Sequence, residues 1–303
     1  MADSCPAPAP RQEESRFRRI AREYFESPLA TIALVVFCII LLAALFAPWI
    51  SPQNPYDPLE INFMDARLAP GSHASESDMT YWLGTDAQGR DMVSSILYGI
   101  RISLAVGVLS SFIAMLVGAA LGLVSSYLGG FFDALLMRIV EIQISLPSAL
   151  VALVFISLFG RGVDRLIIAL VLVQWAYFAR TVRASALSER NKEYVEAAAC
   201  LAMPTWRVIF QYIFPNCLAP LLVIVTIQMS HAITLEASLS FLGLGLPVTE
   251  PSLGLLISNG FRHLMNGRYW ISMYPGLALF VLVMAINLVA DRLRDIFNPR
   301  LQR

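Results

Sequence analysis

The sequence predicts an all-α integral membrane protein with six transmembrane helices and with both termini on the inner side of the membrane. Three observations predict this fold. Apolar residues make up 57% of the 303 residues and charged residues 15%, whereas soluble domains have about 45–50% and about 25%. Six stretches are apolar enough to form spans, each of which needs about 20 residues. Basic residues gather in the segments that six crossings would place on one side.

The six expected spans follow the apolar runs along the chain. The first exceeds the apolar core of a cleaved signal peptide, so we expect a retained span. The second contains no charged residue, and an amphipathic stretch from Phe131 precedes the third. The fourth is short, although it can be extended at both ends. The spans are expected at 29–50, 102–124, 142–159, 166–179, 217–233 and 272–289.

Positive charges set the orientation of these spans. With an inner N-terminus, fifteen of the 22 Lys and Arg residues lie in the inner segments. The prolines of the external segment that starts at Ser51 prevent the first helix from continuing. We therefore expect a cytoplasmic tail at 1–27, a first span at 28–50, an external loop with an interfacial segment at 51–100, and a five-helix core at 101–303.

The inner loop between the fourth and fifth spans has a distinct pattern, NKEYVEAAACLAMPTW (191–206). Asn191 can cap a helix, and Glu193 suits the positive first turn of that helix. The alanines favour helix, and Pro204 limits its continuation. The pattern predicts a short cytoplasmic helix followed by a sharp break.

Such a short helix has too few large apolar residues to be stable alone, so it should lie against another surface. That surface is either the protein's own membrane domain, which would make the loop an ordinary connector, or a partner protein. Ala197 and Ala198 are small enough to allow close approach, and Glu196 adds one fixed charge.

The run EAAACLAMPTWRVIFQYIFPN resembles the EAA loop of permease subunits in binding-protein-dependent ABC importers. Glu196, Ala197 and Ala198 match the start of the family pattern, and Pro215 matches its end. The glycine of that pattern falls at Ala202. If this position needs a positive φ angle, an alanine there is strained by roughly 1 kcal/mol or more.

Two further stretches carry the same resemblance. WLGTDAQGRDMVSSILYGIRISL (82–104) is similar to the segment before the second span in dipeptide, oligopeptide and nickel permeases of the C-subunit type. LEASLSFLGLGLPVTEPSLGLLIS (235–258) is similar to their segment after the fifth span. The resemblance runs from about Pro28 to the C-terminus. It implies a type I ABC importer permease with a MetI-like core and an EAA coupling loop at 188–206.

The resemblance also implies a function and partners. The chain would be a non-catalytic transport subunit of the cell (inner) membrane, surrounded by lipid, that forms half of a translocation path for di- and oligopeptides. A second homologous permease, two cytoplasmic ATP-binding subunits and an external substrate-binding protein would complete the importer. Glu196 would pair with a basic residue of the ATPase. No cofactor is expected in this chain, because it lacks a phosphate-binding G-x-x-x-x-G-K-[ST] motif and ATP would be bound by the partner subunits.

Polar residues inside the expected spans are candidates for lining the translocation path. The alternative is that they form hydrogen bonds between helices. Arg138 and Glu141 are three residues apart and therefore share a helix face, so they are a candidate intramembrane ion pair. The other candidates are Gln143, Gln174, Gln228, His231 and Asn287.

Other sites and functions are less well supported by the residues. The four cysteines show no metal-ligand spacing, so no metal site is expected. The motif GTDAQGRD does not fit a calcium loop, and Thr85 or Asp86 is expected to cap a helix there. The zero net charge gives no support for a nucleic-acid partner.

Three alternative functions remain open on the residues alone. Permeases for nickel or another small solute have similar sequences. A stand-alone secondary transporter would often show inverted repeats, which we do not see. An intramembrane hydrolase would need a motif such as H-E-x-x-H or G-x-S-x-G, which the sequence lacks.

Overall fold

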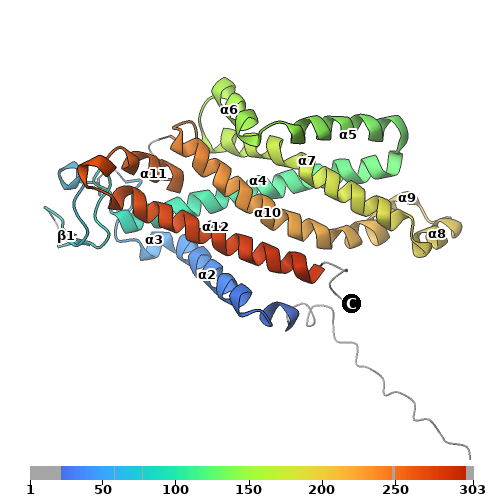
Figure 1. The fold of residues 1–303 in the computed structure, drawn as a ribbon, viewed down its shortest axis with the longest axis horizontal. Helices are drawn as coiled ribbons and strands as arrows, with labels where there is room; N and C mark the ends of the chain where they lie inside the picture. Colours follow the sequence, from blue (N-terminus) through green and yellow to red (C-terminus); the bar gives the residue numbers. More distant parts are fainter. Residues whose placement is uncertain (1–21, 58, 77, 248–249, 298–303) are drawn as a thin grey trace, which may run out of the picture.

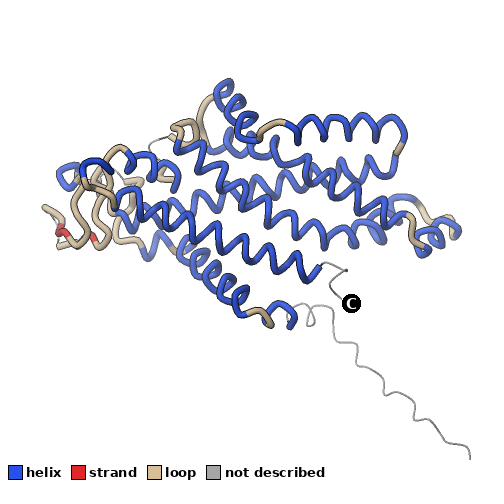
Figure 2. Tube along the Cα trace, in the orientation of Figure 1, coloured by secondary structure: helices blue, strands red, loops and turns tan. Residues whose placement is uncertain are grey.

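The computed structural model describes residues 22–57, 59–76, 78–247 and 250–297. This part of the chain is an elongated bundle of helices with a small antiparallel hairpin at one end (Figures 1 and 2). Within it, five helical segments are long and apolar enough to cross a membrane, and a bent helix pair makes a sixth if it is counted as one span. The predicted all-α membrane fold is confirmed. The basic residues at 11–19, 300 and 303, which were expected on the inner side of the membrane, lie outside the described residues.

The long helices run to and fro between the end of the bundle that carries the β1–β2 hairpin and the opposite end (Figure 1). In chain order the elements are α2 (Pro28–Leu45), α3 (Ala47–Ile50), η1 (Phe63–Asp65), β1 (Ser72–His73), β2 (Thr80–Tyr81), α4 (Met92–Leu128), α5 (Gly130–Ser145), α6 (Ser148–Phe159), α7 (Val163–Arg190), α8 (Glu193–Cys200), α9 (Thr205–Val208), η2 (Ile209–Ile213), α10 (Phe214–Phe241), α11 (Leu253–Phe261), η3 (Leu264–Asn266) and α12 (Trp270–Phe297). Most helices extend beyond the apolar runs that predicted them.

Helix α4 begins ten residues before the expected start of the second span. Its N-cap is Asp91, whose carboxylate accepts the backbone N–H of Ser94 at 2.7 Å. The expected capping role of Thr85 or Asp86 is therefore wrong. The Thr85 hydroxyl instead accepts the Leu68 N–H at 2.7 Å, and the Asp86 carboxylate accepts backbone N–H groups of its own loop. Both residues stabilise the loop before α4 rather than start the helix.

The third span, expected at 142–159, is bent and consists of two helices. Helices α5 and α6 meet at an angle of 92°. Pro147 disfavours helical backbone at the preceding residue, and Leu146 is accordingly extended, with ψ 139°. The stretch from Phe131, expected only to precede the span, belongs to α5, which is the longer arm. Figure 1 shows α5 running beside α4 and α7.

The fifth span is longer than the expected 217–233. Elements α9, η2 and α10 form one continuous helical segment from Thr205 to Phe241. Its η2 section is π-helical and ends at Ile213, two residues before Pro215. A proline removes a backbone donor and crowds the preceding turn, and a local π-turn is one way in which a helix accommodates such a disruption. Pro204 immediately precedes α9, at the break that the sequence predicted.

The centre of the bundle is the pair of helices α4 and α7, which pack together more extensively than any other two described elements. Small residues of α4 make this possible. A Cβ atom added to Gly118 would lie 2.6 Å from the Phe178 Cβ atom, and one added to Gly122 would lie 2.6 Å from the Ala179 carbonyl oxygen. The two backbones can approach closely only because these positions lack side chains.

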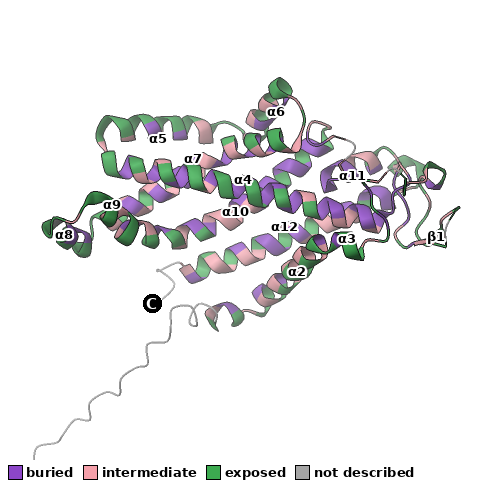
Figure 3. Cartoon of the chain, turned by 180° about the vertical axis from the view of Figure 1, so that it is seen from behind, coloured by how far each residue is buried: buried purple, intermediate pink, exposed green. Residues whose placement is uncertain are grey.

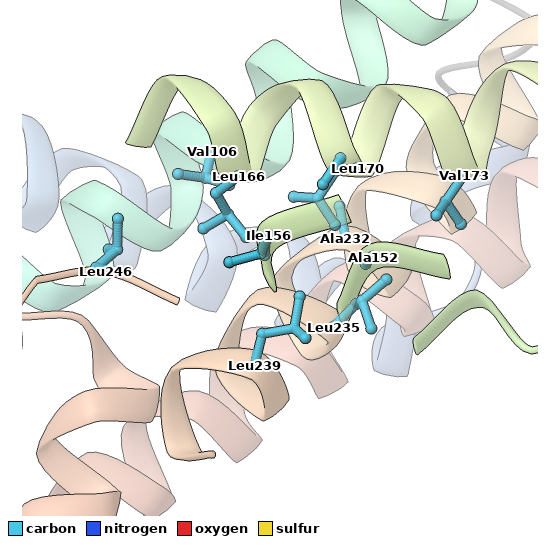
Figure 4. Packing of buried hydrophobic residues seen from close by; sticks show 11 residues of the cluster. Val106, Ala152, Ile156, Leu166, Leu170, Val173, Ala232, Leu235, Leu239 and Leu246 are labelled. Atoms are coloured by element: carbon cyan, nitrogen blue, oxygen red, sulfur yellow. The ribbon is translucent and has the colours of Figure 1, made fainter. Parts of the chain in front are cut away.

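An apolar cluster attaches α6 and α10 to this pair. Figure 4 shows that it joins residues of α4, α6, α7 and α10. Its buried members are Val106, Ala152, Ile156, Leu166, Ala169, Leu170, Val173, Ala232, Leu235, Leu239 and Leu246. By contrast, α2 and α5 are largely exposed in this single chain (Figure 3). These two helices therefore have apolar faces that lipid or another protein must cover.

We predict that Gly118→Ala lowers the thermal stability of the purified protein. The added methyl group has no room between α4 and α7, and overpacking typically costs about 1–3 kcal/mol. Thermal unfolding in detergent, followed by tryptophan fluorescence, measures the effect. Gly276→Ala in α12 is the matched control, because no atom lies within 4 Å of its added Cβ. Equal melting temperatures for both variants would contradict the close packing.

Candidate functional site

The candidate site is the short helix α8, beyond the end of α7 at the end of the bundle opposite the hairpin (Figure 1), which is the end that the sequence predicts to be the inner one. The predicted short helix in this loop is present. Asn191 does not begin it, which corrects its expected capping role, since Asn191 ends α7 instead. The carbonyl oxygen of Lys192 accepts the first two backbone bonds of the new helix, from Val195 at 2.9 Å and from Glu196 at 3.2 Å.

Helix α8 has one buried face and one exposed face. Val195 and Ala198 are buried, and Val195 belongs to a cluster with Ala186, Ile213 and Cys217. The exposed face carries Glu193, Glu196, Ala197 and Cys200. Ala198 is thus covered by its own chain. Of the three residues at the start of the EAA pattern, only Glu196 and Ala197 are available to a partner.

Tyr194 ties α8 to two other helices. Its hydroxyl donates to the Glu189 carboxylate of α7 and accepts a bond from the Asn216 amide of α10 at 3.1 Å. Burial and the Glu189 carboxylate raise the pKa of Tyr194 to about 12, so the phenol remains a proton donor at neutral pH. Its ring also lies 6.3 Å from that of Tyr212. A displacement of α8 would therefore pull on α7 and on the start of α10.

The helix ends next to α8 are joined by further polar contacts. Arg190 of α7 donates to the Ser126 carbonyl oxygen at 3.0 Å and lies over the ring of Tyr127. Further along the bundle, Arg183 forms an ion pair with Asp133 of α5. These contacts hold the inner ends of α4, α5 and α7 together.

The turn after α8 contains a strained alanine. Ala202 has φ 54°, one of two non-glycine residues with positive φ among those described. The Met203 N–H bonds to the Ala198 carbonyl oxygen at 3.2 Å, which is the Schellman pattern with Ala202 in the position that glycine usually occupies. The position does need a positive φ angle, so Ala202 is strained as the sequence predicted. Pro215 is not part of this turn and lies at the start of α10.

Two of the candidate path residues are buried between helices. Gln174 of α7 is fully buried and accepts a bond from the Ser111 hydroxyl of α4 at 3.1 Å. This is the interhelical hydrogen bond that the sequence left open as an alternative. Gln228 is also buried, and its amide nitrogen has no hydrogen-bond partner among the described residues. Neither side chain lies on the surface of the chain.

The other candidates are accessible from outside the chain. His231 is exposed on α10, and Asn287 of α12 lines a shallow, mainly apolar cleft of about 460 Å³ together with Thr234. Gln143 is half-buried on α5. Of these three side chains, the exposed ones thus lie on α10 and α12, and the half-buried one lies on α5.

Arg138 and Glu141 lie on α5, with their charged groups 3.4 Å apart. Their side chains are 75% and 56% exposed. The pair is therefore directed outwards from this chain rather than towards its core. Because ionised side chains are costly in lipid, they rarely face it directly.

Sequence reasoning missed the buried carboxyl group inside the fifth span. Glu236 of α10 is fully buried and accepts hydrogen bonds from Ser103 of α4 at 2.9 Å and from Ser240 at 2.8 Å. The available signal was an acidic residue inside an apolar run, next to serines in LEASLS. Its position links α4 to α10. Among the described residues, no group of three or more His, Cys, Asp or Glu side chains is placed to hold a metal ion.

Comparison with known proteins gives two family matches. Residues 114–303 match the model of the binding-protein-dependent transport system inner membrane component. Residues 15–70 match the N-terminal transmembrane domain of oligopeptide transport permease C. The larger of the two matches covers more than half of the chain.

Curated relatives match along most of their length. The dipeptide transport system permease protein DppC of Escherichia coli K12 is 39% identical over 274 residues, which is 90% of each chain. The di/tripeptide transport system permease protein DppC of Pseudomonas aeruginosa UCBPP-PA14 is 37% identical, over 90% of this chain and 87% of that protein.

A solved structure shares the fold. An inward-facing form of the MetNI methionine ABC transporter contains a chain that superposes with a TM-score of 0.55 at 21% identity. The match covers 68% of this chain and 97% of that chain. The shared part is the MetI-like core that the sequence predicted.

We predict that Ala202→Gly stabilises the turn after α8 by about 1 kcal/mol, because glycine adopts a positive φ without the steric cost that alanine pays. Hydrogen exchange of the amides at 193–203 measures the effect and should slow about fivefold. Ala197→Gly is the control, since it places glycine within the helix and should speed exchange by a similar factor. Faster exchange in Ala202→Gly would contradict the strained turn.

Proposed function

This chain belongs to the family of binding-protein-dependent transport system inner membrane components, the permeases of ABC importers, and we propose that its cargo is di- and oligopeptides. It is a multi-pass protein of the inner membrane. The observation that carries the cargo proposal is the identity of 37–39% over nine-tenths of the chain to permeases named for dipeptide and di/tripeptide transport. The match to the oligopeptide permease N-terminal domain supports the same cargo class.

As a permease of this family, the chain works with an ATPase and with a substrate-binding protein. We propose that the complete importer holds a second, homologous permease and two ATPase subunits, and that this chain has no catalytic role. It also binds no cofactor of its own in this proposal. ATP is bound by the partner subunits, since the sequence lacks a phosphate-binding motif of the P-loop type.

The exposed face of α8 is the proposed ATPase-docking surface. Glu196 provides the charge for a basic residue of the ATPase, and Ala197 allows close approach. The opposite face of α8 is fastened to its own chain through Val195 and Tyr194. Movement of a docked ATPase would therefore be transmitted to α7 and α10, which is the mechanical connection that coupling needs.

The proposed translocation path lies where the two permeases meet. His231 and Asn287 are exposed in the single chain. Both belong to helices long enough to span the membrane. Arg138 and Glu141 are exposed on the bent third span. Contact with lipid would be costly for such groups, whereas a second permease and a water-filled path would satisfy them.

We predict that Glu196→Arg abolishes coupling while the protein still inserts and folds. Reversing the charge places a guanidinium group against the basic residue of the ATPase, and disrupting one partner of a buried ion pair typically costs about 3–5 kcal/mol. Binding-protein-dependent peptide uptake into proteoliposomes should fall to background, with normal expression of the variant.

Asp295→Arg is the matched control, because it makes the same charge change at an exposed position near the inner end of α12, away from α8. Uptake by this variant should stay within about twofold of wild type. Normal uptake by a stably expressed Glu196→Arg protein would refute the docking assignment.

A further inference from the structure

A second cavity opens near the inner end of the bundle, and the function described above does not use it. It has a volume of about 640 Å³ and lies between the last turns of α7, the first turns of α10 and the last turns of α12. This volume is in the range of pockets that bind small molecules, about 300–1,000 Å³. Because α8 adjoins the same ends of α7 and α10, the cavity is on the cytoplasmic side.

One part of the cavity wall is polar and carries both signs of charge. Arg294 of α12 is exposed there and forms no ion pair or hydrogen bond with any residue in the described part of the chain. Ser185, Ser188 and Asn216 supply neutral hydrogen-bonding groups, and Glu189 supplies a carboxylate. A free guanidinium group is well suited to bind a carboxylate through two parallel hydrogen bonds.

The remaining wall is apolar. Pro220 and Val223 of α10 and Phe297 of α12 contribute to it. A suitable ligand therefore has a carboxylate, a hydrogen-bonding or cationic group a few atoms away, and a small apolar side chain. Amino acids and short peptides combine these three features.

We propose that this inner cavity binds a short peptide or amino acid from the cytoplasmic side, with the ligand carboxylate on Arg294. The ligand amino group then lies towards Glu189 and its apolar side chain towards Phe297. This inference rests on the proposed function in one respect, since peptide import would deliver such molecules to that side of the membrane.

The cavity is directly connected to the coupling helix. Glu189 and Asn216 line it, and the same two residues hold the Tyr194 hydroxyl of α8. Glu189 also accepts a bond from Lys192 at 2.6 Å, just before α8. A ligand in the cavity favours the arrangement of α8 in which these contacts are made. By linkage, a bound ligand opposes any movement of α8 that breaks them, and ATP hydrolysis slows.

The first experiment measures binding to the complete permease–ATPase complex in nanodiscs, without the binding protein. The probe is radiolabelled dialanine. Arg294→Gln should weaken its binding at least about tenfold, because a charge-assisted contact is lost. Dialanine amide, which lacks the carboxylate, should compete at least about tenfold less well than dialanine.

Arg292→Gln is the matched control. It removes the same charge two residues away, but Arg292 donates to the Glu23 carbonyl oxygen and does not line the cavity. Its dialanine affinity should equal that of the wild type. Tyr194→Phe distinguishes dialanine binding from its effect on ATP hydrolysis. This variant should bind dialanine as the wild type does, yet lose the slowing of ATP hydrolysis, measured relative to its own rate without dialanine.

Three results would overturn the inference. The first is equal dialanine affinity in the wild type and in Arg294→Gln. The second is displacement of dialanine by phosphatidylglycerol in the nanodisc, which would assign Arg294 to a lipid headgroup. The third is an absence of dialanine binding in a complex that imports peptides with its binding protein. A wild-type complex that binds dialanine but imports no peptide would instead contradict the proposed function.

Discussion

The close approach of α4 and α7 is the constraint on which the rest of the structure depends. Gly118 and Gly122 leave room for the backbone of α7, which larger side chains would exclude. The Gln174–Ser111 hydrogen bond crosses the same interface and satisfies the buried Ser111 hydroxyl and the buried Gln174 side-chain carbonyl oxygen. The other helices pack on the two sides of this pair. The bent α5–α6 segment covers one side, while α10 and α12 form the other.

This arrangement determines which helices must move when a partner protein moves α8. The inner ends of α4, α5 and α7 are joined by the Asp133–Arg183 ion pair and by the contacts of Arg190. Helix α8 projects beyond them and is fastened through Val195 and Tyr194. It is too short to be stable alone, so its position is set by the chain that carries it. A partner that moves α8 must therefore move the ends of α7 and α10 as well.

The sequence was a good guide wherever a single local rule decided the structure. The apolar runs predicted the all-α membrane fold, and the alanine-rich loop predicted the short helix α8. The family pattern located the strained turn, because the position of its glycine is occupied by Ala202 with φ 54°. Pro204 lies at the predicted break, immediately before α9, because its ring fixes the backbone φ angle and removes a hydrogen-bond donor.

Features that depend on tertiary packing could not be predicted in this way. Helix α4 starts early because Ser94 and Gly99 are buried against the external segments, which hydropathy does not register. Pro147 marks where the third span bends, but the direction that α6 takes after the bend also depends on how it packs against α7. Ala198 has the same chemistry as Ala197, and only the orientation of α8 makes one buried and the other exposed.

Chemical cross-linking from Cys200 tests most directly whether the exposed face of α8 is the surface that meets the ATPase. Cys200 is an exposed native thiol on that face. With the other three cysteines replaced by serine, a short bifunctional thiol–amine reagent would be added to native membranes, and the adduct identified by mass spectrometry. A cross-link between Cys200 and a lysine of a P-loop ATPase is the predicted result. Full modification of Cys200 in assembled, transporting complexes, with no link to an ATPase, would contradict the docking of α8.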